Sequence, residues 1–181
     1  MVSDEALAMR LKAGDRSALE MLFERHYDHL FGYLFRITFG DRALAADLAQ
    51  ESFLRALRGI HTYDSGRPFK AWLYGIATNA ARNAATSADA RHTESLEADA
   101  DYPDDAPPFE QTLLEAEAAG SVTAALRQLP EHQREAIVLF YNQSFSLSQI
   151  ASTLNIPVGT VKSRLSLGVK QLRKIIEAGN T

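Results

Sequence analysis

Residues 86–112 constrain the architecture of this chain most, because they contain many acids and few large apolar side chains. The stretch carries one Arg against eight Asp and Glu, a net charge of −7. Such a composition buries too little apolar surface to offset the entropy lost on ordering. We therefore predict a flexible acidic linker between two compact domains, residues 1–85 and 113–181, each near the lower size at which a domain folds alone.

Both predicted domains show the apolar period of an α-helix, and no long segment alternates with period two. In the first domain we expect helices over residues 19–37 and 42–58 and a third helix opened by Pro68, a residue favoured in the first turn. The first of these helices has the apolar stripe Leu19, Leu22, Phe23, His26, Leu30, Tyr33, Leu34 and Ile37. The fold class is therefore all-α.

The second domain has the pattern of a helix-turn-helix, two helices joined by a tight turn. After expected helices near 110–128 and 131–141, Ser146 and Gln149 form a capping-box pattern, and Asn155 suits the left-handed end of a helix. A last helix is expected over 158–176. Its exposed face near the N-terminus offers Thr160, Lys162, Ser163 and Arg164, where a recognition helix meets bases and phosphates. The alternative is a helical hairpin with a solvated basic face.

Composition excludes several function classes. The chain has no cysteine and hence no disulfide or thiolate metal site, and it has no apolar run long enough to cross a membrane. His26 and His29 are spaced like half a metal site, but no further ligand pattern joins them. No phosphate-binding glycine loop or nucleophile elbow occurs. We expect a cytoplasmic protein that is not an enzyme, with no cofactor, no metal, no small-molecule substrate and no direct membrane insertion.

Five strings in order give a resemblance that covers nearly the whole chain apart from the acidic segment. They are LFERHYDHLFGYL, DLAQESFLRALRGI, FKAWLYGIATNAARN, LPEHQREAIVL and IPVGTVKSRL. Together they resemble the bacterial RNA polymerase sigma factors of the sigma-70 family, extracytoplasmic-function (ECF, group 4) type. The resemblance implies two helical domains, regions 2 and 4, that bind core RNA polymerase, recognise the −10 and −35 promoter elements and help to open the DNA.

The resemblance assigns the face carrying Asp47, Gln50 and Glu51 to docking on core polymerase. These residues lie at i, i+3 and i+4 and so share one side of a helix, and polar groups suit a reversible interface. An ordinary solvated face is the alternative. Phe53, in the same string, is expected in the core.

The resemblance assigns the −10 element to the loop after residue 60 and the helix that follows it. The expected contacts are Tyr63, Trp72, Asn79, Arg82 and Asn83. Asn79 and Asn83 share a helix face and can read the edge of an unstacked base, Tyr63 can stack on a base, and Arg82 can hold a phosphate. Trp72 lies in the apolar stripe and is expected in the core more than on DNA.

The resemblance assigns Thr160, Lys162, Ser163 and Arg164 to the −35 element. For Arg134 two roles remain open, contact with the DNA backbone or a bond at a helix terminus. The chain departs from many relatives at Leu167-Gly168, where an arginine-alanine pair is common, and Gly168 weakens the helix by about 1 kcal/mol relative to alanine.

Two readings compete with this one: a dimeric helix-turn-helix regulator of duplex DNA and a protein-binding adaptor. The strings at 47–56 and 69–79 favour the sigma factor, because a sensor or dimerisation module has no physical need for them. The resemblance also implies an anti-sigma protein as a partner, and an acidic linker that follows a positively charged channel of the polymerase.

Overall fold

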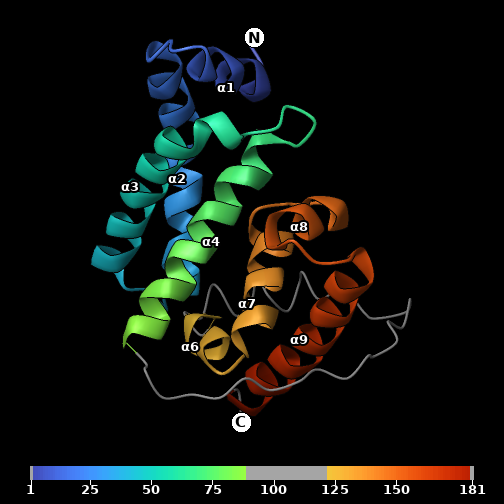
Figure 1. The fold of residues 1–181 in the computed structure, drawn as a ribbon. Helices are drawn as coiled ribbons and strands as arrows, with labels where there is room; N and C mark the ends of the chain where they lie inside the picture. Colours follow the sequence, from blue (N-terminus) through green and yellow to red (C-terminus); the bar gives the residue numbers. More distant parts are fainter. Residues whose placement is uncertain (1, 89–121, 180–181) are drawn as a thin grey trace. The chain divides into compact units, whose positions relative to one another are not determined.

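The computed structural model describes residues 2–88 and 122–179, and every regular element in these two ranges is helical, as the sequence predicts (Figure 1). The chain divides into two compact units. The first is built from α1 (Asp4–Lys12), α2 (Ser17–Ile37), α3 (Arg42–Gly59), the short 3₁₀ helix η1 (Ile60–Thr62) and α4 (Phe69–Ala88). The second is built around α6 (Val122–Arg127), α7 (Glu131–Ile137), the π-helical turn η2 (Val138–Asn142), α8 (Leu147–Leu154) and α9 (Val158–Gly179).

The predicted linker falls outside the described residues except at its first three positions, which are helical. Helix α4 continues to Ala88, beyond the boundary expected at residue 85. In this last stretch two side chains bond to backbone carbonyls one turn earlier in the helix. Thr86 Oγ1 donates to the Arg82 carbonyl at 2.9 Å, and Ser87 Oγ donates to the Asn83 carbonyl at 2.8 Å. The part of the predicted helix at 110–128 that the structure describes is α6.

Helix α2 forms the centre of the first unit and packs against α1, α3 and α4. Leu22, Leu30 and Leu34 of its stripe are fully buried. Where the stripe meets α4, the rings of Tyr33 and Tyr74 lie 5.3 Å apart, and the Tyr33 hydroxyl is 2.8 Å from Thr78 Oγ1. Burial of these apolar side chains supplies the main favourable term for this bundle.

Helix α1 is an element that the sequence patterns did not predict. The Ser3 hydroxyl caps it by accepting from the Ala6 amide at 3.1 Å, and its apolar residues Leu7, Ala8 and Leu11 are buried. Its first turn is joined to α2 through Asp4, whose carboxylate lies 2.8 Å from His26 Nε2 and accepts from Arg25 at 2.8 Å. The predicted stripe residue His26 is thus buried, while its neighbour in the stripe, Phe23, is 39% exposed.

We expect His26 to make the first unit less stable as the pH falls below about 6.5, the ordinary histidine pKa. Burial lowers the pKa of His26, against an opposing effect of the Asp4 carboxylate. The unfolded chain therefore takes up the proton more readily than the folded chain. The free energy of unfolding should decrease by at most about 1.4 kcal/mol per pH unit for this one proton.

Urea unfolding between pH 5 and 7.5 measures this slope. His26→Gln should reduce it, whereas His29→Gln, at an exposed position on the same helix, should leave it unchanged. Equal slopes for the His26 variant and the wild type would show that His26 does not carry the pH dependence.

The second unit depends on a close approach of α7 and α9 at Gly168, which is buried. A Cβ atom at this position would lie 2.7 Å from Ile137 Cδ1 and 3.2 Å from Gln133 Cβ. The low helix propensity of Gly168, expected from the sequence, is therefore accompanied by tighter packing of the two helices. After Ile137 the expected helix does not continue in α form but widens into η2.

Both ends of α8 have the predicted chemistry. The Ser146 amide donates to Gln149 Oε1 at 2.8 Å and the Gln149 amide donates to Ser146 Oγ at 3.2 Å, a reciprocal capping box. Asn155 ends α8 at a φ of 55°, in the left-handed region. These local bonds fix where α8 begins and where α9 can start.

Gly168→Ala is expected to destabilise the second unit by about 1 kcal/mol, because overpacking costs roughly 1–3 kcal/mol and outweighs the gain of about 1 kcal/mol in helix propensity. Gly159→Ala is the matched control, since nothing lies within 4 Å of a Cβ there, and it should be neutral or stabilising. Hydrogen exchange of the α9 amides measures both. A more stable Gly168→Ala variant would contradict the close packing.

Candidate nucleic-acid interface

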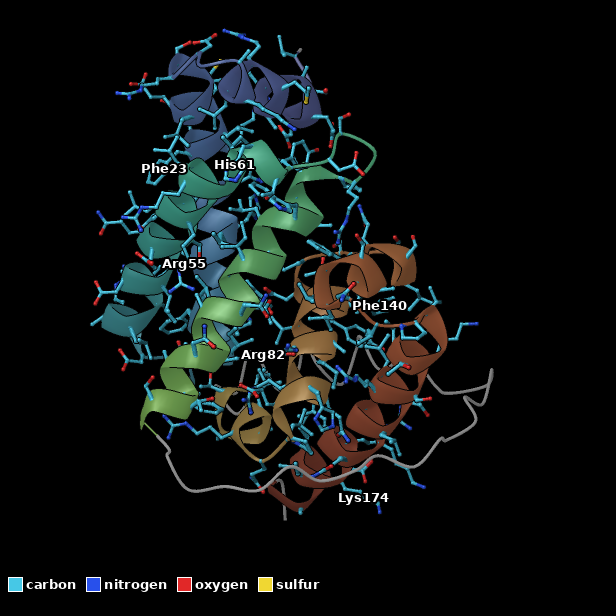
Figure 2. The ribbon with its side chains drawn as sticks, in the orientation of Figure 1. Phe23, Arg55, His61, Arg82, Phe140 and Lys174 are labelled. Carbon is cyan, nitrogen blue, oxygen red and sulfur yellow. The ribbon has the colours of Figure 1, made fainter. Side chains whose placement is uncertain are left out.

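The predicted docking face lies on the outer side of α3. Asp47 and Gln50 are exposed, and Glu51 is half-buried. Glu51 forms an ion pair with Arg55, which is labelled in Figure 2, with Oε1 2.8 Å from Nε. The hydrogen bond from Arg55 holds the pKa of the Glu51 carboxyl below its ordinary value. Phe53, at the edge of this face, is 5% exposed, which confirms its predicted core position.

An apolar side chain that sequence reasoning missed lies on the same face. Leu54 follows Asp47 by seven residues and Gln50 by four, and it is 42% exposed. Beside α3, the ring of Phe23 lies 4.8 Å from that of Phe53 and lines a hollow of about 290 Å³ together with Leu19, Glu20 and Glu24. The outer side of α2 and α3 therefore combines carboxylates with exposed apolar groups, as interfaces often do.

The structure corrects the expected role of Tyr63. Its side chain is 1% exposed, and its ring packs 5.8 Å from Phe69 and 5.2 Å from Trp72. Its hydroxyl donates to the Arg67 carbonyl at 2.7 Å, and burial raises its pKa to about 12, so the hydroxyl stays protonated. In this arrangement the Tyr63 ring is covered and cannot stack on a base.

Two side chains of α1 contact the segment around Tyr63. Lys12 Nζ donates to the Tyr63 carbonyl at 2.9 Å, and Glu5 Oε1 accepts from the Phe69 amide at 3.2 Å. These two bonds lie at the start and just beyond the end of the loop that links η1 to α4. Neither residue belongs to a motif in the sequence, because the contact depends on the position of α1.

The remaining −10 candidates lie along α4. Asn79 and Asn83 are exposed one turn apart, and Trp72 is half-buried two turns before Asn79. Arg82, labelled in Figure 2, is half-buried. Residues 72, 79 and 83 are spaced to share one side of the helix. Of the expected set, the structure thus leaves an indole and two carboxamides accessible on α4.

The −35 candidates lie in the first two turns of α9. Lys162 is exposed, and Thr160, Ser163 and Arg164 are half-buried. Ser163 Oγ donates to the Gly159 carbonyl at 3.2 Å, and Val158, at the start of the helix, is 40% exposed. Sequence reasoning missed Val158; an exposed apolar residue here has the chemistry to contact a thymine methyl group.

Of the two roles left open for Arg134, the structure supports the bond at a helix terminus. The side chain is 7% exposed, and Nη1 donates to the carbonyls of Leu129 at 3.0 Å and Leu126 at 3.4 Å. These carbonyls belong to the end of α6 and the turn after it, where backbone acceptors lack helical partners. The guanidinium is thus covered rather than presented to DNA.

Within residues 2–88 and 122–179 no helix is long and apolar enough to cross a membrane, and no three His, Asp or Glu side chains gather into a metal site. The two histidines that are spaced like half a metal site lie in different environments: His26 is buried and bonded to Asp4, whereas His29 is exposed.

Family models match both units. The Sigma-70 region 2 model matches residues 22–91 and the Sigma-70, region 4 model matches residues 119–172. The two regions and their order are those of sigma-70 transcription initiation factors. The ECF RNA polymerase sigma factor SigW of Bacillus subtilis is 33% identical over 173 residues, 91% of this chain and 92% of SigW.

Further relatives agree. The ECF RNA polymerase sigma factor SigM of Mycobacterium tuberculosis is 33% identical over 179 residues, 99% of this chain and 87% of SigM. Among solved structures, CnrH in complex with the cytosolic domain of CnrY matches with a TM-score of 0.71 at 25% identity over 97% of both chains. The sigma factor RpoE in complex with the anti-sigma factor NepR, from Bartonella quintana, has the same fold, with a TM-score of 0.63 at 22% identity over 87% of this chain and 96% of RpoE. The chain belongs to the ECF sigma factors of RNA polymerase.

Proposed function

We propose that this chain binds core RNA polymerase, recognises the −10 and −35 elements of a promoter and helps to open the DNA for initiation. The proposal rests on two exposed surfaces in a chain with both sigma regions: the α3 face, with Asp47, Gln50 and Leu54, and the N-terminal turns of α9, with Lys162. In this proposal the protein acts in the cytoplasm by binding the polymerase and DNA, and the polymerase carries out the covalent chemistry of RNA synthesis.

Run-off transcription with purified core polymerase and genomic promoter fragments tests this function. Specific transcripts should form when the chain is added as the sole initiation factor, and sequencing the bound fragments gives the promoter. A dimeric helix-turn-helix regulator would instead require a separate sigma factor. Absence of transcripts unless another sigma factor is present would therefore replace the proposed function with that alternative.

The α3 face docks on the polymerase through a mixed surface. Asp47, Gln50 and Glu51 supply polar contacts that set orientation, and Leu54, one turn beyond Gln50, supplies an apolar contact. The Glu51–Arg55 pair fixes one carboxylate before binding. This arrangement suits a partner with basic and amide side chains around an apolar groove.

The double variant Asp47→Ala, Gln50→Ala is expected to weaken binding to core polymerase at least tenfold, a loss of about 1.4 kcal/mol. Both side chains are exposed, so the helical signal and the unfolding midpoint should stay unchanged. Asp28→Ala, at an exposed position on α2, is the control for the lost charge. Fluorescence anisotropy of the labelled chain measures the affinity, and wild-type affinity of the double variant would remove α3 from the interface.

The −10 strand binds along α4 and the loop before it. Asn79 and Asn83 read the edge of an unstacked base, Arg82 holds a phosphate, and the accessible edge of Trp72 adds apolar contact. Stacking is assigned to Trp72 rather than to Tyr63, because the Tyr63 ring is covered.

The −35 element binds the start of α9. Lys162 and Arg164 contact phosphate or guanine, Thr160 and Ser163 contact phosphate or base edges, and Val158 contacts a methyl group. Because Leu167-Gly168 lacks the basic group common in relatives, fewer phosphate contacts follow along the helix.

Lys162→Ala and Arg164→Ala should each lower promoter affinity and flatten its salt dependence by about one unit of log–log slope, if each residue neutralises one phosphate. Lys170→Ala, at an exposed position further along α9, is the matched control and should keep the wild-type slope. Titration of a promoter duplex between 50 and 200 mM salt, roughly the range over which phosphate contacts are resolved, measures the slopes. An unchanged slope for either variant would assign that residue to a role other than phosphate contact.

An anti-sigma protein is the further partner that we propose, since a structural relative, RpoE, was solved with the anti-sigma factor NepR. Such a partner would act by covering the α3 face or the start of α9. The acidic segment, with a net charge of −7 over residues 86–112, is proposed to follow a positively charged path in the polymerase.

A further inference from the structure

The loop that links η1 to α4, residues 63–67, is closed into a ring by its own bonds. The Tyr63 hydroxyl donates to the Arg67 carbonyl at 2.7 Å, and the Arg67 amide donates to the Asp64 carbonyl at 3.0 Å. Asp64 Oδ1 accepts from the Gly66 amide at 2.9 Å, as in an Asx turn. The loop therefore has a defined backbone shape although residues 64–67 are exposed.

Helix α1 holds this ring at both ends. Lys12 Nζ donates to the Tyr63 carbonyl at 2.9 Å, and Glu5 Oε1 accepts from the Phe69 amide at 3.2 Å, the first amide of α4. Both bonds join a charged side chain to a backbone group, the kind of hydrogen bond that is stronger than one between neutral groups. Glu5 also places a negative charge at the positive end of the α4 dipole.

Helix α1 is itself fixed in place and can act as a support. Leu7, Ala8 and Leu11 are buried, and Asp4 is bonded to both His26 and Arg25 of α2. Helix α1 thus connects α2 to the loop: it packs and bonds against α2, and its Lys12 binds the carbonyl of Tyr63. No other element of the part described makes a side-chain bond to that carbonyl.

We propose that α1 is a positioning element for promoter opening: Glu5, Lys12 and the hydroxyl of Tyr63 hold the 63–67 loop in the shape that receives the unpaired −10 strand. This inference rests on the proposed function and adds three positioning residues to it. A loop that is ordered before binding loses less conformational entropy on capturing a strand. Tyr63 acts through its hydroxyl and the loop backbone, not by stacking on a base.

The first test compares Lys12→Met with Arg10→Met. Both remove one positive charge from α1, but Arg10 is paired with Asp15, 2.7 Å away, and makes no bond to the loop. Hydrogen exchange of the Gly66 and Arg67 amides in the full chain should accelerate about tenfold in Lys12→Met, the effect of losing one charge-assisted bond. Arg10→Met should keep the wild-type rates.

The second test uses the wild-type chain and its variants with core polymerase on the promoter fragment recovered by sequencing. Permanganate reactivity of unpaired thymines measures opening, and affinity for core polymerase and for a −35 duplex is measured in parallel. Lys12→Met should open about tenfold less promoter, with both affinities unchanged. Arg10→Met should open as much as the wild type.

Conservative variants separate positioning from simple loss of folding. Tyr63→Phe keeps the ring and its packing but removes the bond to the Arg67 carbonyl, so it should reduce opening, whereas a stacking role would leave opening unchanged. Glu5→Gln keeps an acceptor oxygen for the Phe69 amide and should retain most of the opening that Glu5→Ala loses. Unfolding midpoints identify any variant whose fold is affected.

The outcomes are distinct. Wild-type exchange rates in Lys12→Met, or faster exchange with undiminished opening, would overturn the role of α1 while leaving the proposed function intact. A wild-type chain that neither binds core polymerase nor opens any promoter would overturn the proposed function, and this inference with it.

Discussion

Burial of the apolar stripe of α2 is the interaction on which the first unit depends. Leu22, Leu30 and Leu34 fill the space against the surrounding helices, and this packing decides which side of each neighbouring helix remains outside. Once Ala49 and Ala56 are inside, Asp47 and Leu54 lie on the opposite side of α3, because helical geometry sets their directions about half a turn apart. The surface that we propose to face the polymerase is therefore a consequence of how the core packs.

Most of the helices could be predicted because their signals are local. The period of α2, the capping box at Ser146 and the left-handed Asn155 each involve residues within a few positions of one another. Helix α1 could not be predicted in the same way, because a helix of nine residues with three buried positions is too short to reveal a helical period. The π-helical turn after Ile137 was missed as well, because its residues are as apolar as those of an α-helix.

The candidate site was predictable where it depends on spacing and not where it depends on tertiary contacts. Spacing placed Asp47 with Gln50 and Asn79 with Asn83 on common faces, and these side chains are exposed. Tyr63 and Arg134 carry groups typical of nucleic-acid contacts, but both are buried with backbone carbonyls as partners. A backbone acceptor is present at every residue, so nothing in the sequence distinguishes the carbonyls that these two side chains bind.

The same property explains why contacts to the backbone suit the 63–67 loop in its proposed role of receiving a DNA strand. Lys12 and the Tyr63 hydroxyl bind carbonyl groups, and Glu5 binds an amide, so the shape of the loop does not depend on which side chain stands at residue 65. The Ser65 side chain takes part in none of these bonds and is exposed. In the proposed function, a substitution at residue 65 can therefore change contacts with the strand without removing these bonds, whereas a substitution of Asp64 would also remove the bond from the Gly66 amide.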